Sequence, residues 1–139
     1  MAGIFADTSY WIAVALPDDQ WAPTVRAARS SMGKTQLVTT EEVLIEFLTA
    51  LSSRGRYVRA RGASLVRSIL RDRDVTVVHQ THDSFLNGLD LYERRLDKQY
   101  SAVDCISMNT MKRLRIRQAL TNDRHFAQEG FRVLIPLEP

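Results

Sequence analysis

Short apolar segments alternate along this 139-residue chain with longer segments of helical periodicity. The short segments are bounded by turn-forming or polar residues, and we predict strands at residues 3–6, 36–39, 75–78, 119–121 and 132–135. Elsewhere apolar residues recur every three or four positions, which predicts helices at residues 8–16, 21–33, 39–55, 57–72, 81–96, 100–111 and 123–128. Apolar strands that alternate with helices favour a parallel sheet covered on both faces. The sequence therefore predicts a three-layer α/β/α fold around a mainly parallel sheet of about five strands.

The composition is that of an ordinary globular protein, with 45% hydrophobic and 25% charged residues. We expect residues 1–139 to form a single domain. No apolar run approaches the roughly 18 residues that cross a membrane. The first residues lack the charged and apolar regions of a signal peptide. Cys105 is the only cysteine, so no internal disulfide forms, and these features together predict a cytoplasmic protein without a membrane partner.

Basic residues are concentrated in one part of the sequence. Seven arginines lie between positions 54 and 73, and no acidic residue occurs from position 47 to 71. Guanidinium groups pair bidentately with phosphate oxygens, so this segment is a candidate RNA-binding surface, on which we expect Arg59 and Arg67 to make contact. The alternative is a solvated helix face that keeps the protein soluble.

Four acidic residues stand at positions that invite a specific role. Asp7 ends the first predicted strand, and Asp123 comes just after the fourth. Asp104 lies in an apolar helix, and Glu46 is the only charge among residues 43–48. A carboxylate in an apolar setting is costly unless it is paired, hydrogen-bonded or bound to a metal. Open α/β sheets bind ligands beyond the carboxyl ends of their strands, where these side chains are expected to meet.

Each acid also has a purely structural explanation. Ser101 and Asp104 have the spacing of a capping box, Asp123 suits a helix cap, and Asp7 suits a turn. Glu46 is explained equally well by a salt bridge or partial exposure. Together, however, four carboxylates at one edge of a sheet would repel one another unless a cation held them. Hard divalent ions with oxygen ligands, Mg²⁺ or Mn²⁺, meet that need.

Several segments carry a family resemblance. They are residues 4–9 (IFADTS), Glu46 in its apolar helix, residues 97–98 (DK), residues 100–108 (YSAVDCISM), residues 120–126 (LTNDRHF) and residues 130–131 (GF). In these segments the chain resembles PIN-domain nucleases, and more narrowly the VapC-type toxins of toxin–antitoxin pairs. The resemblance covers nearly the whole chain except residues 54–96.

The resemblance implies a metal-dependent endoribonuclease that leaves a 5′-phosphate and a 3′-hydroxyl. It implies that Asp7 and Asp104 bind the ion directly, and that Glu46 and Asp123 bind it, act through water or position the nucleophile. It also implies RNA as the substrate, an antitoxin as partner and a homodimer, with Trp11, Ile12 and the helix at residues 43–51 as candidate partner surfaces.

Hydroxyl and imidazole side chains near these acids carry weaker signals. Ser9, Ser107 and Thr121 are candidates for orienting a carboxylate or contacting a phosphate, although local capping explains them equally well. The three histidines show no metal-ligand spacing. His125 is a candidate for contacting a phosphate, but we expect it to lie at the surface.

Two other functions are compatible with the same residues. A phosphotransferase of the haloacid-dehalogenase type would use Asp7 as a phosphorylated nucleophile, but that chemistry usually needs a second aspartate two positions later, where this chain has Ser9. A non-catalytic receiver or RNA-binding module would use the acids for structure alone.

Overall fold

The computed structural model describes residues 3–136, in which five strands form one sheet in the order β3-β2-β1-β4-β5. Every neighbouring pair is parallel. The predicted three-layer α/β/α fold with a parallel sheet is therefore confirmed. The elements are β1 (Ile4–Ala6), α1 (Thr8–Ala15), α2 (Ala22–Met32), β2 (Leu37–Thr40), α3 (Glu41–Leu51), α4 (Arg56–Arg71), β3 (Val75–Val78), α5 (His82–Arg94), α6 (Ala102–Arg113), β4 (Gln118–Leu120), α7 (Arg124–Gln128) and β5 (Arg132–Val133).

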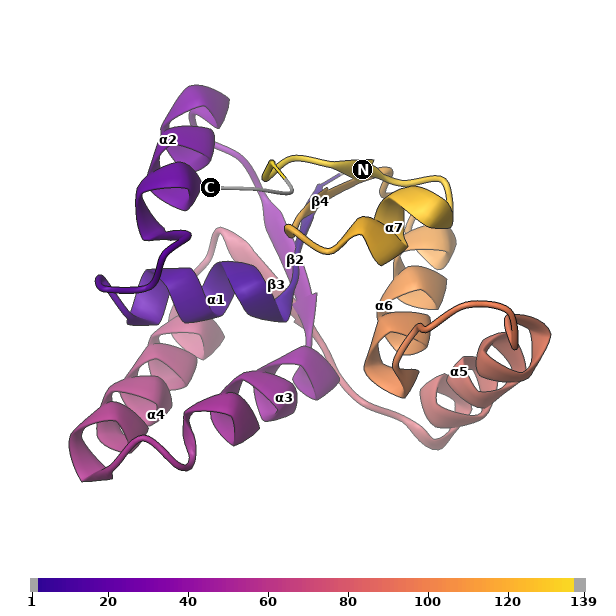
Figure 1. Cartoon of the computed structure of the whole chain (residues 1–139), viewed down its shortest axis with the longest axis horizontal. Coiled ribbons are helices and arrows are strands. Elements are labelled where there is room, and N and C mark those ends of the chain that lie inside the picture. The colour runs from indigo at the N-terminus through magenta and orange to yellow at the C-terminus, as the bar shows by residue number, and fades with distance from the viewer. Residues whose placement is uncertain (1–2, 137–139) are drawn as a thin grey trace.

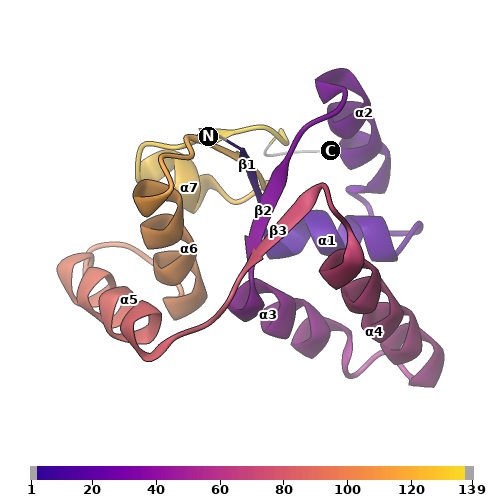
Figure 2. The same ribbon diagram turned by 180° about the vertical axis from the view of Figure 1, so that it is seen from behind.

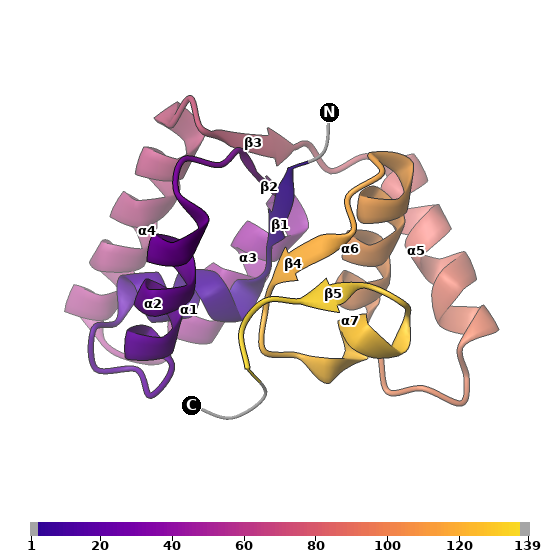
Figure 3. The same cartoon turned by 90° about the horizontal axis from the view of Figure 1, so that it is seen from above.

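The order of the strands reverses at β1. From β1 the chain first adds β2 and β3 on one side, and then returns to add β4 and β5 on the other. Because parallel crossovers are right-handed, this reversal sends helices to opposite faces of the sheet. Figures 1 and 2 show α1–α4 on one side of the sheet and α5–α7 on the other, and Figure 3 shows the same division from above. The β1–β4 pair is therefore the switch point of the sheet.

The element boundaries differ from the predicted ones most at α3, which begins at Glu41 and ends at Leu51 instead of spanning residues 39–55, and at β5. The strand ends at Val133, although the N–H of Leu134 still donates to the carbonyl of Ala119 at 2.9 Å. Ile135 is 1% exposed. The apolar pattern that predicted a strand through residue 135 therefore reflects burial of an irregular segment.

The core lies on both faces of the sheet around β1 and β4. Phe5, Phe47, Met108 and Phe126 are fully buried and come from four different elements. Trp11 is 4% exposed and donates its Nε1–H to the Thr39 hydroxyl at 3.3 Å, so it is a core residue and not part of a partner surface.

Helix α5 packs closely on α6 through a glycine. A Cβ placed on Gly88 would lie 2.5 Å from Cγ1 of Ile106, so only glycine allows this approach. Among residues 3–136, no helix combines the length and the apolar character that crossing a bilayer requires.

Candidate active site

Asp7 sits at the switch point, directly after β1. It occupies the N-cap position of α1 without a side-chain capping bond, and its backbone N–H donates to the carbonyl of Leu120 at the end of β4. The Thr121 hydroxyl donates to Oδ2 of Asp7 at 2.8 Å, which fixes the side chain. Burial raises the pKa of Asp7 to about 7, against the lowering effect of hydrogen bonds from the Thr8 backbone and Thr121. A buried carboxyl with so high a pKa is poorly stabilised as an anion unless a cation is present.

The side chain of Glu46 extends from α3 towards the start of α1, next to Asp7. The hydroxyl of Thr8, in the first turn of α1, donates to its Oε1 atom. Burial raises the pKa of Glu46, and the charges of Asp104 and Asp123 raise it further. Glu46 is the only charged residue of α3 beyond its first turn, and its side chain points towards the other acids. This contact explains why residue 46 is charged although its neighbours in the helix are apolar.

Asp104 lies in the first turn of α6 and has two roles at once. It forms the predicted capping box with Ser101, since each side chain accepts from the other's backbone N–H at 3.0 Å. The same residue lies among the acids: burial raises its pKa, the backbone hydrogen bond from Ser101 lowers it, and the charge of Asp123 raises it. A capping role therefore does not exclude a role in the site.

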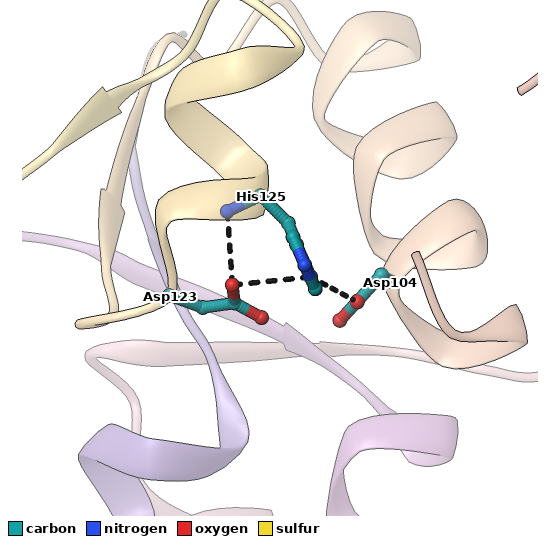
Figure 4. A group of neighbouring side chains, drawn as sticks. All are labelled: Asp104, Asp123 and His125. Atoms are coloured by element: carbon teal, nitrogen blue, oxygen red, sulfur yellow. Dashed lines mark hydrogen bonds and ion pairs between the residues drawn. The ribbon is translucent and has the colours of Figure 1, made fainter. Parts of the chain in front are cut away.

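Asp123 caps α7 and is accompanied by His125. Oδ1 of Asp123 accepts the backbone N–H of His125 at 2.9 Å, as a helix cap does. Nδ1 of His125 lies 3.2 Å from Oδ1 of Asp123 and 3.4 Å from Oδ2 of Asp104 (Figure 4). The expectation that His125 lies at the surface is therefore wrong, because its side chain is only 22% exposed and points between two acids.

The predicted hydroxyl residues occupy different places. Thr121 links two acids, since its Oγ1 donates to Asp7 and accepts the Asp123 N–H at 3.0 Å. Oγ of Ser9 lies 3.4 Å from Oγ1 of Thr121. Ser107, one turn beyond Asp104 on α6, has a buried Oγ without a hydrogen-bond partner in residues 3–136.

The arginines expected to contact RNA are exposed on α4, and Arg59 donates from Nη1 to the Ser52 carbonyl at 3.1 Å. Figures 1 and 3 show α4 on the opposite side of the molecule from α6 and α7, which carry Asp104 and Asp123. The helix that carries Arg59 and Arg67 therefore lies on the side of the sheet that α6 and α7 do not cover.

All four predicted acids line one open pocket. They come from the end of β1, from α3, from the start of α6 and from the start of α7, four segments that are distant in the sequence. The donor set consists of carboxylate oxygens, with hydroxyls that orient them and one imidazole beside them. Such a set suits a divalent cation, since carboxylates are ligands of Mg²⁺ and Mn²⁺.

Comparisons with known proteins agree with this geometry. The family model described as PIN domain matches residues 4–131. VapC20 of Mycobacterium tuberculosis, described as a 23S rRNA-specific endonuclease in strains H37Rv and CDC 1551, is 30% identical over 128 residues, covering 92% of this chain and 95% of its own. The crystal structure of that organism's VapC20, described as a sarcin–ricin loop cleaving toxin, superposes with a TM-score of 0.84 at 29% identity, covering 96% of this chain and 99% of the other.

Proposed function

The chain belongs to the PIN-domain family, and on that basis we propose that it is a metal-dependent endoribonuclease, the toxin of a VapBC-type pair. The observation that carries the proposal is the convergence of Asp7, Glu46, Asp104 and Asp123 on one pocket at the switch point of the sheet. Neither the haloacid-dehalogenase interpretation nor the non-catalytic module receives support from the relatives.

We propose large-subunit ribosomal RNA as the substrate. The support is the near full-length similarity to VapC20, which is described as acting on 23S rRNA. Exposed arginines on α4, including Arg59 and Arg67, would hold the phosphate backbone of a large, folded RNA outside the pocket. The cytoplasm, where ribosomes are found, is the compartment that this substrate implies.

In the proposed mechanism, Asp7 and Asp104 would hold Mg²⁺ or Mn²⁺, and Glu46 and Asp123 would hold it directly or through water. When bound, the ion supplies positive charge beside the scissile phosphate and acidifies water. The chain's own part is preorganisation: Thr121 orients Asp7, Thr8 orients Glu46 and the capping box orients Asp104. Each carboxylate is thus fixed before RNA arrives, which reduces the reorganisation needed for catalysis.

The proposal is tested by mapping cleavage of purified ribosomes and of total RNA, with Mg²⁺, with Mn²⁺ and with EDTA. We expect specific cuts with 5′-phosphate ends, lost in EDTA and in Asp104→Asn. An asparagine side chain at this position still accepts the Ser101 N–H, so the helix cap is kept, and a circular dichroism spectrum checks the fold. Asp83→Asn, an exposed aspartate in the first turn of α5, is the matched control and should cut normally. Undiminished cleavage by Asp104→Asn would refute the proposed site.

We also propose a homodimer formed through α5. This helix exposes an apolar stripe that continues just beyond its end, and every residue in the stripe is 41–81% accessible: Phe85, Leu86, Leu89, Tyr92 and, after the helix, Leu96. Leu89→Lys should give a monomer in light scattering, whereas a wild-type monomer would refute this interface.

The antitoxin requires a different face. Three apolar side chains on α1 and α3, two helices that also contribute residues to the pocket, are 36–51% accessible: Val14, Ile45 and Leu48. We propose that an antitoxin covers this smaller apolar patch. The gene neighbour of this chain, expressed with it, should co-purify with the wild type and be lost from Ile45→Glu.

A further inference from the structure

We infer that Nδ1 of His125 is a ligand of the ion bound by Asp104 and Asp123, which makes the site select Mn²⁺ over Mg²⁺. The inference rests on the proposed metal dependence and deepens it. It assigns a role to a residue that the sequence pattern did not single out, and it divides the acidic pocket into two chemically different parts.

Three side chains form the tightest group of potential ligands in residues 3–136. One ligand atom each from Asp104, Asp123 and His125 lie within 4.8 Å of one another. Adjacent ligands of an octahedral ion, each about 2.1 Å from it, are about 3.0 Å apart. The observed separations of 3.2 and 3.4 Å are close to that spacing, so a small inward movement would close the set around an ion.

Tyr100 and Glu129 support the imidazole of His125 on the side away from the two aspartates. The ring of Tyr100 packs against it, with centroids 5.5 Å apart at 54°. The Tyr100 hydroxyl donates to Oε1 of Glu129 at 3.0 Å, and Glu129 is in turn bound by Arg95 at 2.9 Å and by Lys112 at 2.7 Å. A ring supported in this way stays turned towards the carboxylates, as the supporting residues of metal sites commonly ensure.

The donor chemistry of the group explains the expected selectivity. Mn²⁺ prefers oxygen ligands, but as a first-row transition ion it accepts an imidazole nitrogen more readily than Mg²⁺, which is bound by oxygen and releases its waters reluctantly. Asp7 and Glu46 lie outside the three-residue group and offer only oxygen. The Asp104–Asp123–His125 part of the pocket is therefore the part where a nitrogen favours Mn²⁺.

One other arrangement uses the same contacts. A protonated His125 would form ion pairs with both aspartates, and an arriving cation would expel it. The two arrangements differ in one observable, which is whether a histidine nitrogen is bonded to the bound ion.

Pulsed electron paramagnetic resonance of the Mn²⁺-loaded wild-type protein measures that bond. We expect a nitrogen modulation on the Mn²⁺ signal, which changes from the ¹⁴N to the ¹⁵N pattern when only histidine is ¹⁵N-labelled. This comparison needs no substitution, so it does not depend on the folding of a variant. His125→Asn should abolish the modulation, and His82→Asn, an exposed histidine on α5, should retain it.

Titration of the same proteins with Mn²⁺ and with Mg²⁺ gives a second measurement, the affinity for each ion. His125→Asn should weaken Mn²⁺ binding by about tenfold or more and change Mg²⁺ binding much less. If Mn²⁺ binds the wild type without a histidine modulation, the inference is wrong and the proposed nuclease function stands. If Mg²⁺ binds and Mn²⁺ does not, the inference is wrong and the proposed metal dependence stands. If neither ion binds, the inference and the proposed metal dependence are both wrong.

Discussion

Replacing Asp7 by asparagine should stabilise the metal-free protein at pH 8 while it abolishes cleavage. The carboxyl is 5% exposed, and burial, together with the charges of Asp104 and Glu46, raises its pKa from 3.8 to about 7. The substituted amide would keep an acceptor oxygen for the Thr121 hydroxyl and would replace the other carboxylate oxygen by an uncharged NH2 group. The main effect of the variant on stability is therefore the loss of the buried negative charge.

The direction of the pH dependence of stability follows from how Asp7 binds its proton in the folded and unfolded states. The folded protein keeps the Asp7 proton up to about pH 7, whereas the unfolded chain releases it near pH 4, so this carboxyl stabilises the fold least at high pH. Its contribution is intact below about pH 4 and is lost as the pH rises to about 7. The full shift corresponds to roughly 4 kcal/mol, and relaxation of the pocket reduces this to about 2–3 kcal/mol.

Urea unfolding in EDTA at pH 5 and pH 8 measures the difference. Asp7→Asn should be more stable than the wild type by about 2–3 kcal/mol at pH 8 and by clearly less at pH 5. Asp83→Asn, an exposed aspartate, should show no such pH-dependent gain. A variant less stable than the wild type at pH 8, or a gain of equal size at both pH values, would refute the reasoning.

Three further predictions concern other parts of the fold. The hydrogen bonds that Glu129 accepts, above all from Arg95, lower its pKa to about 2, so its contribution to the free energy of unfolding is lost as the pH falls from about 4.5 to 2. Glu129→Gln should therefore lower the free energy of unfolding in urea by about 2 kcal/mol at pH 7 and by little at pH 2. Gly88→Ala should lower the free energy of unfolding by about 1–2 kcal/mol, because its Cβ would meet Ile106, and an unchanged midpoint would contradict the tight α5–α6 contact. Arg67→Glu should weaken RNA binding at low salt and reduce its salt dependence in filter-binding assays; equal affinity would remove α4 from the RNA surface.

Much of the site follows from general rules applied to the sequence. Asp7 and Asp123 follow strands that turned out to be β1 and β4, and the carboxyl ends of neighbouring parallel strands must meet. Glu46 was identifiable because an isolated charge in an apolar helix needs a partner. The resemblance to PIN-domain nucleases, carried by the same residues, is confirmed by the family match. Their roles as ligands stay predictions.

His125 shows where such reasoning stops. Its place depends on how α7 packs beside the start of α6, and neither the spacing to Asp104 nor any local pattern encodes that contact. One signal was available in the sequence. Asp123 suits a helix cap, and His125, two positions later, then lies in the first turn of the same helix, close to the Asp123 side chain. Ile135 illustrates the same limit, since burial without a strand gives the same apolar pattern as a strand.

The central claim is that the four acids converge in order to hold a divalent ion. A crystal of the protein grown with Mn²⁺ and measured at an anomalous wavelength tests it most directly. We predict an anomalous peak in the pocket about 2.2 Å from carboxylate oxygens that include Asp7 or Asp104. A pocket without a peak, or Mn²⁺ bound only elsewhere on the surface, would contradict the account.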